Sequence, residues 1–294
     1  MGCTRIMTSV TDAPQAEPKA TPRLSNFTVR YLTALVFIPF GIIGAFVGGA
    51  LLALMLAPLA VIGALEFYSL AANRPQQGIA RAGILGIMLV IAGFYLSVPV
   101  AVGGGLLAAV LGAVIVALLR GYPLPQAVNQ AWTTLLGVLY IGVPIGMLVA
   151  ISNFDRGFLW LVVIFGITWG TDTLAYAGGR VWGRRPLAPK LSPKKTIEGA
   201  LIGIIGGIVP SLLFLLRADA VTTAAVVMIL FGPVVAIVGD LLESAIKRYY
   251  QVKDSHLERL NVIPGHGGVL DRIDALLLVS VYCYLFLTLA GIAT

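Results

Sequence analysis

The chain has 294 residues, of which 59% are hydrophobic and only 11% are charged. Soluble domains carry about 25% charged residues, so this composition excludes a soluble domain and predicts an all-α polytopic membrane protein. The net charge is +7, and the two cysteines, Cys3 and Cys283, form neither a disulfide framework nor a zinc motif.

The chain begins with a polar segment, residues 1–26, which is rich in Pro, Ala and Thr and lacks the apolar core of a signal peptide. We expect a disordered cytoplasmic tail there. Apolar stretches close to the roughly 20 residues that cross a bilayer then predict about nine helical spans. The spans run approximately over 28–46, 49–71, 80–98, 101–119, 131–151, 157–178, 199–216, 221–243 and 269–292.

The positions of Lys and Arg predict the orientation, because positive residues in short loops favour the cytoplasm. With a cytoplasmic N-terminus, every Lys and Arg except Arg156 and Arg217 falls on the cytoplasmic side. We therefore divide the chain into the tail, N-terminal transmembrane helices over 27–156, and a C-terminal region over 157–294. The polar loops 179–198 and 244–268 of that C-terminal region lie on the cytoplasmic face. Residues 180–195 contain basic residues and no acid, which suits either anionic lipid headgroups or a polyphosphate ligand.

The sixth predicted span carries polar residues every four positions, at Thr168, Asp172 and Tyr176. This spacing places them on one face of a helix. An aspartate within a span is costly to desolvate, so it indicates a functional site, although a hydrogen bond to a neighbouring helix would also account for it.

The eighth predicted span ends with a stripe of Asp240, Glu243, Ser244 and Lys247 at helical spacing. Ordinary i,i+4 pairing at the interface would explain part of this stripe. However, Asp240 follows a long uncharged run, which places it within the membrane. A carboxylate at that depth needs a cation as its partner, either a lysine or a metal.

The ninth predicted span follows the glycine-rich turn "PGHGG" and begins with Asp271, Arg272 and Asp274. The backbone N–H groups of such a turn and of the helix start can approach a phosphate. Carboxylates beside a phosphate site require a bridging cation, and magnesium is typically held by one or two carboxylates plus phosphate oxygens. His266 is either an ordinary turn residue or a catalytic base.

Two further patterns indicate structural roles. Gly199, Gly203 and Gly207 recur every four residues and predict close helix packing in the seventh span. Glu66 lies near the cytoplasmic end of the second span, where we favour an interfacial or inter-helix structural role over a catalytic one.

Three segments together resemble a known family. "SAIKRYYQVKD" and "IPGHGGVLDRID" are similar to the signature of the bacterial CDP-diacylglycerol synthases, also called phosphatidate cytidylyltransferases. "DTLAYAGGRVWGRRPLAPKLSPKKTIEG" resembles that family's other recurrent stretch. The resemblance covers roughly residues 165–275, and the N-terminal half matches only as a run of hydrophobic spans.

The resemblance implies an enzyme that joins CTP to phosphatidate with magnesium, and with potassium as an accompanying ion. It implies metal binding by Asp240 and Asp271, with Lys247, Arg272 and Asp274 as further catalytic residues. The remaining implied contacts are to substrate and phosphate, at Asp172, Ser192, Lys194, Lys195, Ser244, Arg248, Lys253, Gly265, His266, Gly267 and Gly268. One departure is the stretch "SHLERLNVI", which is longer than usual in the family and changes where Lys253 lies relative to the site.

Alternative functions are a CTP-dependent transferase or kinase acting on a polyprenyl or phytyl phosphate, a secondary transporter, and a non-catalytic lipid-binding scaffold. The clustering of polar residues at one membrane face disfavours a transporter, whose site would lie at the midplane. We expect an enzyme of the cytoplasmic membrane whose active site faces the cytoplasm. Its expected partners are CTP, phosphatidate, membrane lipid and a second copy of the chain, and we expect no nucleic acid.

Overall fold

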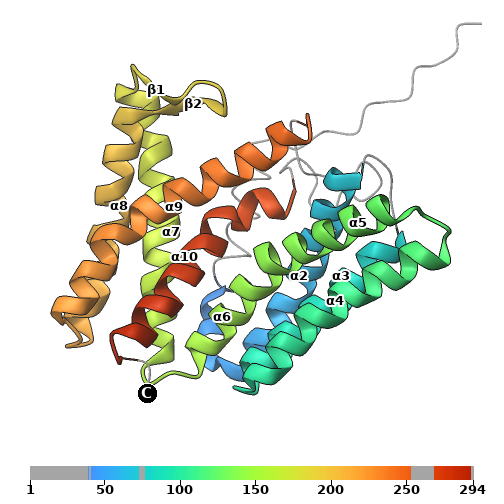
Figure 1. Cartoon of the computed structure of the whole chain (residues 1–294). Coiled ribbons are helices and arrows are strands. Elements are labelled where there is room, and N and C mark those ends of the chain that lie inside the picture. The colour runs from blue at the N-terminus through green and yellow to red at the C-terminus, as the bar shows by residue number, and fades with distance from the viewer. Residues whose placement is uncertain (1–38, 40, 73–76, 253–267, 293–294) are drawn as a thin grey trace, which may run out of the picture.

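The computed structural model describes residue 39 and residues 41–72, 77–252 and 268–292. The predicted tail and most of the first predicted span lie outside these residues, although 41–47 are helical. The elements, shown in Figure 1, are α2 (Gly49–Ala72), α3 (Gln77–Tyr95), α4 (Pro99–Leu119), α5 (Leu124–Gly137), the π-helix η1 (Val138–Gly142), α6 (Val143–Ser152), α7 (Gly157–Trp182), β1 (Pro186–Ala188), β2 (Ser192–Thr196), α8 (Ile197–Arg217), α9 (Thr223–Tyr249) and α10 (Leu270–Leu289).

The described chain is a helical bundle of the kind that a polytopic membrane protein requires. Seven of its helices are long and apolar enough to cross a membrane, with α5, η1 and α6 taken as one continuous helix. A shorter apolar helix covers Ile79–Tyr95. The predicted fold class is therefore confirmed at this level, while the total of nine spans stays a prediction.

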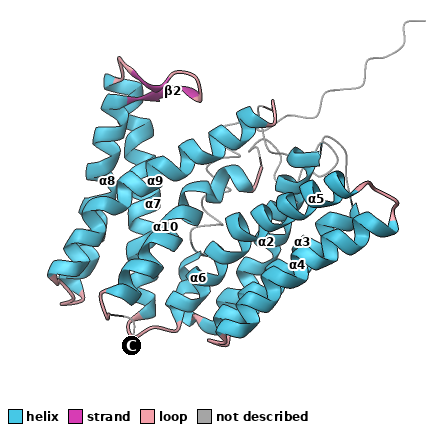
Figure 2. Ribbon diagram, in the orientation of Figure 1, coloured by secondary structure: helices cyan, strands magenta, loops and turns pink. Residues whose placement is uncertain are grey.

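The polar loop predicted at 179–198 contains regular structure that the sequence did not predict. Helix α7 continues to Trp182, and β1 and β2 then form an antiparallel hairpin, shown in magenta in Figure 2. Pro186 lies opposite Thr196, and Ala188 lies opposite Ser192. A hairpin forms here because pairing satisfies the backbone of a polar segment that has no helical pattern.

Helices α7 and α8 pack closely along a row of glycines, as the spacing of Gly199, Gly203 and Gly207 predicted. A Cβ added at Gly203 would lie 2.7 Å from Ala175 Cβ and 2.9 Å from Thr171 O. These distances are too short for any real Cβ contact, so only glycine permits the helices to approach this closely.

Helix α10 joins two hydrophobic cores. Ala275, Val279 and Cys283 belong to the core formed mainly with α7 and α9. Leu270 and Leu277 belong to the second core, which includes residues of α2, α3, η1 and α6. The first turn of α10 therefore lies where the N-terminal and C-terminal helices meet.

Candidate active site

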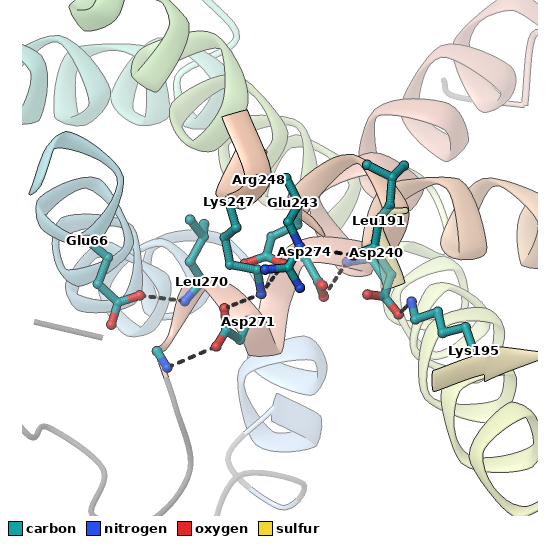
Figure 3. A network of polar contacts seen from close by, with 12 residues as sticks. Glu66, Leu191, Lys195, Asp240, Glu243, Lys247, Arg248, Leu270, Asp271 and Asp274 are labelled. Carbon is teal, nitrogen blue, oxygen red and sulfur yellow. Dashed lines mark hydrogen bonds and ion pairs between the residues drawn. The ribbon is translucent and has the colours of Figure 1, made fainter. Parts of the chain in front are cut away.

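The charged side chains predicted for the site gather where α9 ends, α10 begins and the β1–β2 hairpin lies. Figure 3 shows six of them converging from these three elements, with Glu66 approaching from α2; the six are Lys195, Asp240, Lys247, Arg248, Asp271 and Asp274. Helices α9 and α10 pack against each other along their length. This packing brings residues that are separated in the sequence to one end of the bundle.

Lys247 lies between two carboxylates from different helices. Its Nζ is 2.6 Å from Glu243 Oε2 on the preceding turn of α9 and 3.1 Å from Asp271 Oδ1 on α10. All three side chains are largely buried, and Glu243 is only 2% exposed. A buried ammonium and two carboxylates stabilise one another only in such a paired geometry. Within the described part of the chain, the other oxygen of Glu243, Oε1, has no hydrogen-bond partner.

A second ion pair joins the hairpin to α9, between Lys195 of β2 and Asp240. Burial lowers the pKa of the Lys195 ammonium, and the nearby carboxylates of Asp274, Asp172 and Glu243 oppose this shift. Lys195 thus lies within electrostatic range of acidic residues on α7, α9 and α10.

The two remaining predicted aspartates occupy different environments. Asp274 is 8% exposed, and its Oδ1 accepts the N–H of Ala275 at 2.7 Å. Asp172 lies on α7, within electrostatic range of Lys195 and Asp274. Thr168, one turn earlier on α7, is buried, and its hydroxyl donates to Ile164 O of the same helix.

The first amides of α10 bind carboxylates of the protein itself. Glu66 Oε1 accepts the N–H of Val269 at 2.9 Å, and Glu66 Oε2 accepts the N–H of Leu270 at 2.8 Å. Asp271 Oδ2 accepts the N–H of Gly268 at 3.3 Å. The sequence suggested a phosphate at this helix start, whereas in the structure these three amides are engaged by Glu66 and Asp271.

The hairpin is attached to both neighbouring helices. Glu198 on α8 accepts the backbone N–H groups of Arg184 and Arg185 at 3.0 and 3.2 Å. Arg248 on α9 donates from Nε to Leu191 O at 3.4 Å. These contacts hold β2, which carries Ser192, Lys194 and Lys195, beside the end of α9.

The remaining predicted site residues differ in how exposed they are. Ser192 and Ser244 are partly exposed, and Lys194, Arg248 and Arg272 are exposed. Four predicted residues lie outside the described residues, namely Lys253, Gly265, His266 and Gly267.

Sequence reasoning did not select Glu243 or Tyr140 as site residues. The i,i+4 spacing of Glu243 and Lys247 was a usable signal. Tyr140 belongs to η1, packs against Phe67 with ring centroids 6.0 Å apart, and lies within electrostatic range of Asp274 and Glu243. Its buried hydroxyl has no hydrogen-bond partner among the described residues. No local sequence signal distinguishes "VLYIG" from an ordinary apolar helical turn.

In this structure, the carboxylates of the site that were predicted to bind metal are paired with lysines. The Lys247 ammonium already lies between Glu243 and Asp271, and the Lys195 ammonium pairs with Asp240. The described residues contain no cluster of three or more metal-binding side chains. Magnesium is commonly held by one or two carboxylates together with substrate phosphates and water, so a magnesium site at Asp240 and Asp271 stays a prediction.

Comparisons with known proteins give one consistent similarity. The family model described as "Cytidylyltransferase family" matches residues 28–290. Phosphatidate cytidylyltransferase of Bacillus subtilis (strain 168) is 39% identical over 157 residues, which are 52% of this chain and 57% of the relative. The protein of the same name from Haemophilus influenzae (strain ATCC 51907 / DSM 11121 / KW20 / Rd) is 40% identical over 127 residues, or 41% of this chain and 43% of the relative. The chain thus matches about half the length of these curated relatives.

Proposed function

Because the chain belongs to the cytidylyltransferase family, we propose that it transfers the cytidylyl group of CTP to phosphatidate, giving CDP-diacylglycerol and pyrophosphate. The observation that carries this proposal is the pairing of Lys195 with Asp240 and of Lys247 with Glu243 and Asp271 at one end of an apolar helical bundle. Cations and metal-binding carboxylates at that position suit a phosphate substrate whose acyl chains remain in the membrane. The curated relatives are named for the same activity.

In the proposed step, an oxygen of the phosphatidate phosphate attacks the α-phosphorus of CTP. A new phosphorus–oxygen bond forms, and the bond from the α-phosphorus to the oxygen bridging to the β-phosphate breaks. Pyrophosphate leaves with that electron pair. The attacking phosphate is already largely ionised at neutral pH, so the step needs no strong base. Positioning of the reactants and neutralisation of negative charge then supply the acceleration.

The proposed roles of the side chains follow from their charges. Lys195, Lys247, Arg248 and Arg272 bind phosphate oxygens, together with Lys194. Asp240 and Asp271 would hold magnesium, with Glu243 beside them, and potassium would accompany it. When bound, magnesium would neutralise charge on the phosphate oxygens of CTP. Lys195 and Lys247 keep the carboxylates ionised and oriented before the ion and CTP bind.

The proposal includes the membrane arrangement. The N-terminus is cytoplasmic, the chain crosses the cytoplasmic membrane about nine times, and the hairpin faces the cytoplasm. This placement is supported by the distribution of Lys and Arg. It would give the site direct access to CTP. A homodimer is also part of the proposal, and the molecular mass of the detergent-solubilised protein measured by light scattering tests it.

The activity is tested with the purified full chain in detergent, magnesium, and CTP labelled either at the α-phosphorus or at the γ-phosphorus. Phosphatidate and a polyprenyl phosphate are compared as acceptors. Cytidylyl transfer moves the α-label into lipid and releases the γ-label as pyrophosphate. A CTP-dependent kinase would instead move the γ-label into lipid.

Asp271→Asn is the matched variant, because the amide keeps the shape of the side chain and loses its charge. We expect it to fold and to lose about 100-fold or more in turnover, as the loss of a charge-stabilising group does. Transfer of the γ-label, or no lipid product from a folded wild type with any acceptor, would rule out the proposed function. Near-normal turnover of Asp271→Asn would remove Asp271 from the site.

A further inference from the structure

A buried carboxylate of the N-terminal half holds the helix start that carries the site. Glu66 is 3% exposed and lies on α2, outside the three segments that carry the family resemblance. We infer that Glu66 is a positioning residue for catalysis, which acts by fixing the first turn of α10 and thereby Asp271. This inference rests on the proposed cytidylyl transfer.

The geometry makes Glu66 the cap of α10. Each of its two oxygens accepts one backbone N–H, from Val269 and from Leu270. The residue at the N-cap position of α10, Val269, offers no side-chain cap of its own. The first N–H groups of a helix have no partner within the helix, and leaving them unpaired in a buried place is costly. A carboxylate there also gains from the helix dipole.

The capped amides adjoin the site directly. Asp271 follows Leu270 in the chain, and its two oxygens bind Lys247 Nζ and the N–H of Gly268. A shift of the Val269–Leu270 backbone would therefore move the Asp271 carboxylate relative to Lys247 and Glu243. Glu66 binds the backbone of α10 immediately before Asp271.

The end of α2 that presents Glu66 is itself held in place. The next residue, Phe67, packs against Tyr140 of η1, and the hydroxyl of Tyr68 donates to Thr134 O of α5 at 3.0 Å. Three consecutive residues thus fix α2 to three different elements. This end of α2 is a rigid support, from which a side chain can hold a helix start in one position.

The test compares Glu66→Gln with Tyr68→Phe, a variant that removes another buried interhelical hydrogen bond from the same turn. In Glu66→Gln, the side-chain oxygen still accepts one of the two backbone N–H groups. The side-chain NH2 group, which is a donor, then faces the other backbone N–H and cannot bind it. We expect kcat to fall about 10- to 100-fold, as for a small misplacement of catalytic groups, with less than about a threefold change in KM for CTP. Hydrogen exchange, followed by mass spectrometry, should become faster in the peptide covering 268–275. Tyr68→Phe leaves both bonds from Glu66 to α10 in place, so its effects on kcat and on exchange at 268–275 should be much smaller.

If Glu66→Gln does not fold, Glu66→Asp is a second test variant, because it keeps the negative charge and shortens the side chain. It should show intermediate values of kcat and of exchange. Unchanged exchange at 268–275 in the Glu66 variants, or faster exchange with wild-type kcat, would overturn the inference. An inactive wild type would overturn the proposed function and this role with it. The exchange data would still show whether Glu66 caps α10.

Discussion

Lys247 shows at the scale of one residue how the site balances its charges. It pairs with Glu243 and Asp271, and all three side chains are largely buried. Without the ammonium, two carboxylates would face each other in a place that water reaches poorly. The pairing therefore contributes to the stability of the protein before it contributes to any reaction.

Replacing Lys247 with Met should be strongly destabilising. We expect the free energy of unfolding to fall by about 3–5 kcal/mol, because breaking a buried ion pair leaves its partners uncompensated. Thermal unfolding in detergent measures the change. The double variant Glu243→Gln and Lys247→Met removes one of the stranded charges and should recover part of the loss. A double variant less stable than Lys247→Met alone would contradict this explanation.

Tyr68 and Tyr140 offer a matched comparison of two buried hydroxyl groups. The Tyr68 hydroxyl donates to Thr134 O, whereas the Tyr140 hydroxyl has no hydrogen-bond partner among the described residues. Tyr68→Phe should therefore cost about 0.5–1.5 kcal/mol of unfolding free energy, and Tyr140→Phe should be neutral or stabilising. Unfolding of both variants in detergent without ligands tests this difference. Equal losses would show that Tyr140 has a partner of its own.

Among the individual residues, the sequence indicated which acids and lysines are unusual but did not indicate their partners. Asp240 and Lys247 were recognisable because they end an apolar run. The pairing of Asp240 with Lys195 depends on how the hairpin folds back, and no local pattern encodes it. Glu66 was predicted to have an interfacial or inter-helix structural role, but the amides that it caps could not be predicted because they lie 203 and 204 residues away.

At the scale of elements, the close contact between α7 and α8 depends on glycines, which have no side chain to separate the two helices. A Cβ at Gly203 would lie 2.9 Å from the backbone oxygen of Thr171, and a backbone atom cannot turn aside as a flexible side chain can. The separation of these helices also determines where Asp172 and the hairpin lie, since α7 leads into β1 and β2 leads into α8.

Gly203→Ala should separate the helices and destabilise the bundle by about 1–3 kcal/mol, the usual cost of overpacking. Gly104→Ala in α4 is the control, because a Cβ there has no atom within 4 Å. That control should be neutral or stabilising by up to about 1 kcal/mol through helix propensity. Thermal unfolding of both variants measures these changes in stability. Equal effects would show that the close approach of α7 and α8 does not contribute to stability.

The elements themselves differed in how well the sequence predicted them. Hydropathy located the spans because lipid imposes a local rule, namely about 20 apolar residues for each crossing. The hairpin at 186–196 was missed because its strands are short and carry basic residues and prolines. The π-helix η1 was missed because its five residues are as apolar as those of the α-helices around it.

For the whole molecule, orientation in the membrane decides whether the site can reach CTP. The hairpin precedes α8, and the loop around Val221 follows it. A helix of the length of α8, 21 residues, separates its ends by about 30 Å, close to the thickness of the hydrocarbon core. Lys190 and Val221 should therefore lie on opposite sides of the membrane.

This arrangement predicts that cysteines introduced at these two positions react from opposite sides of the membrane. In a Cys3→Ser background, Lys190→Cys should react with a membrane-impermeant maleimide only after the cells are permeabilised. Val221→Cys should react in intact cells. The native Cys283 is buried and should stay unlabelled in both variants. The reverse pattern would place the hairpin outside the cytoplasm and contradict the proposed access of CTP.

The bond between Glu66 and α10 also has a consequence for how the protein is made. Its acceptor and its donors are 203 and 204 residues apart in the chain. At roughly 5–20 residues per second, a ribosome needs about 10–40 s to synthesise that interval. Helix α2 therefore reaches the membrane long before the amides that its carboxylate caps exist. A helix that is synthesised late completes the environment of one that is synthesised much earlier, so this part of the bundle cannot assemble until α10 has been made.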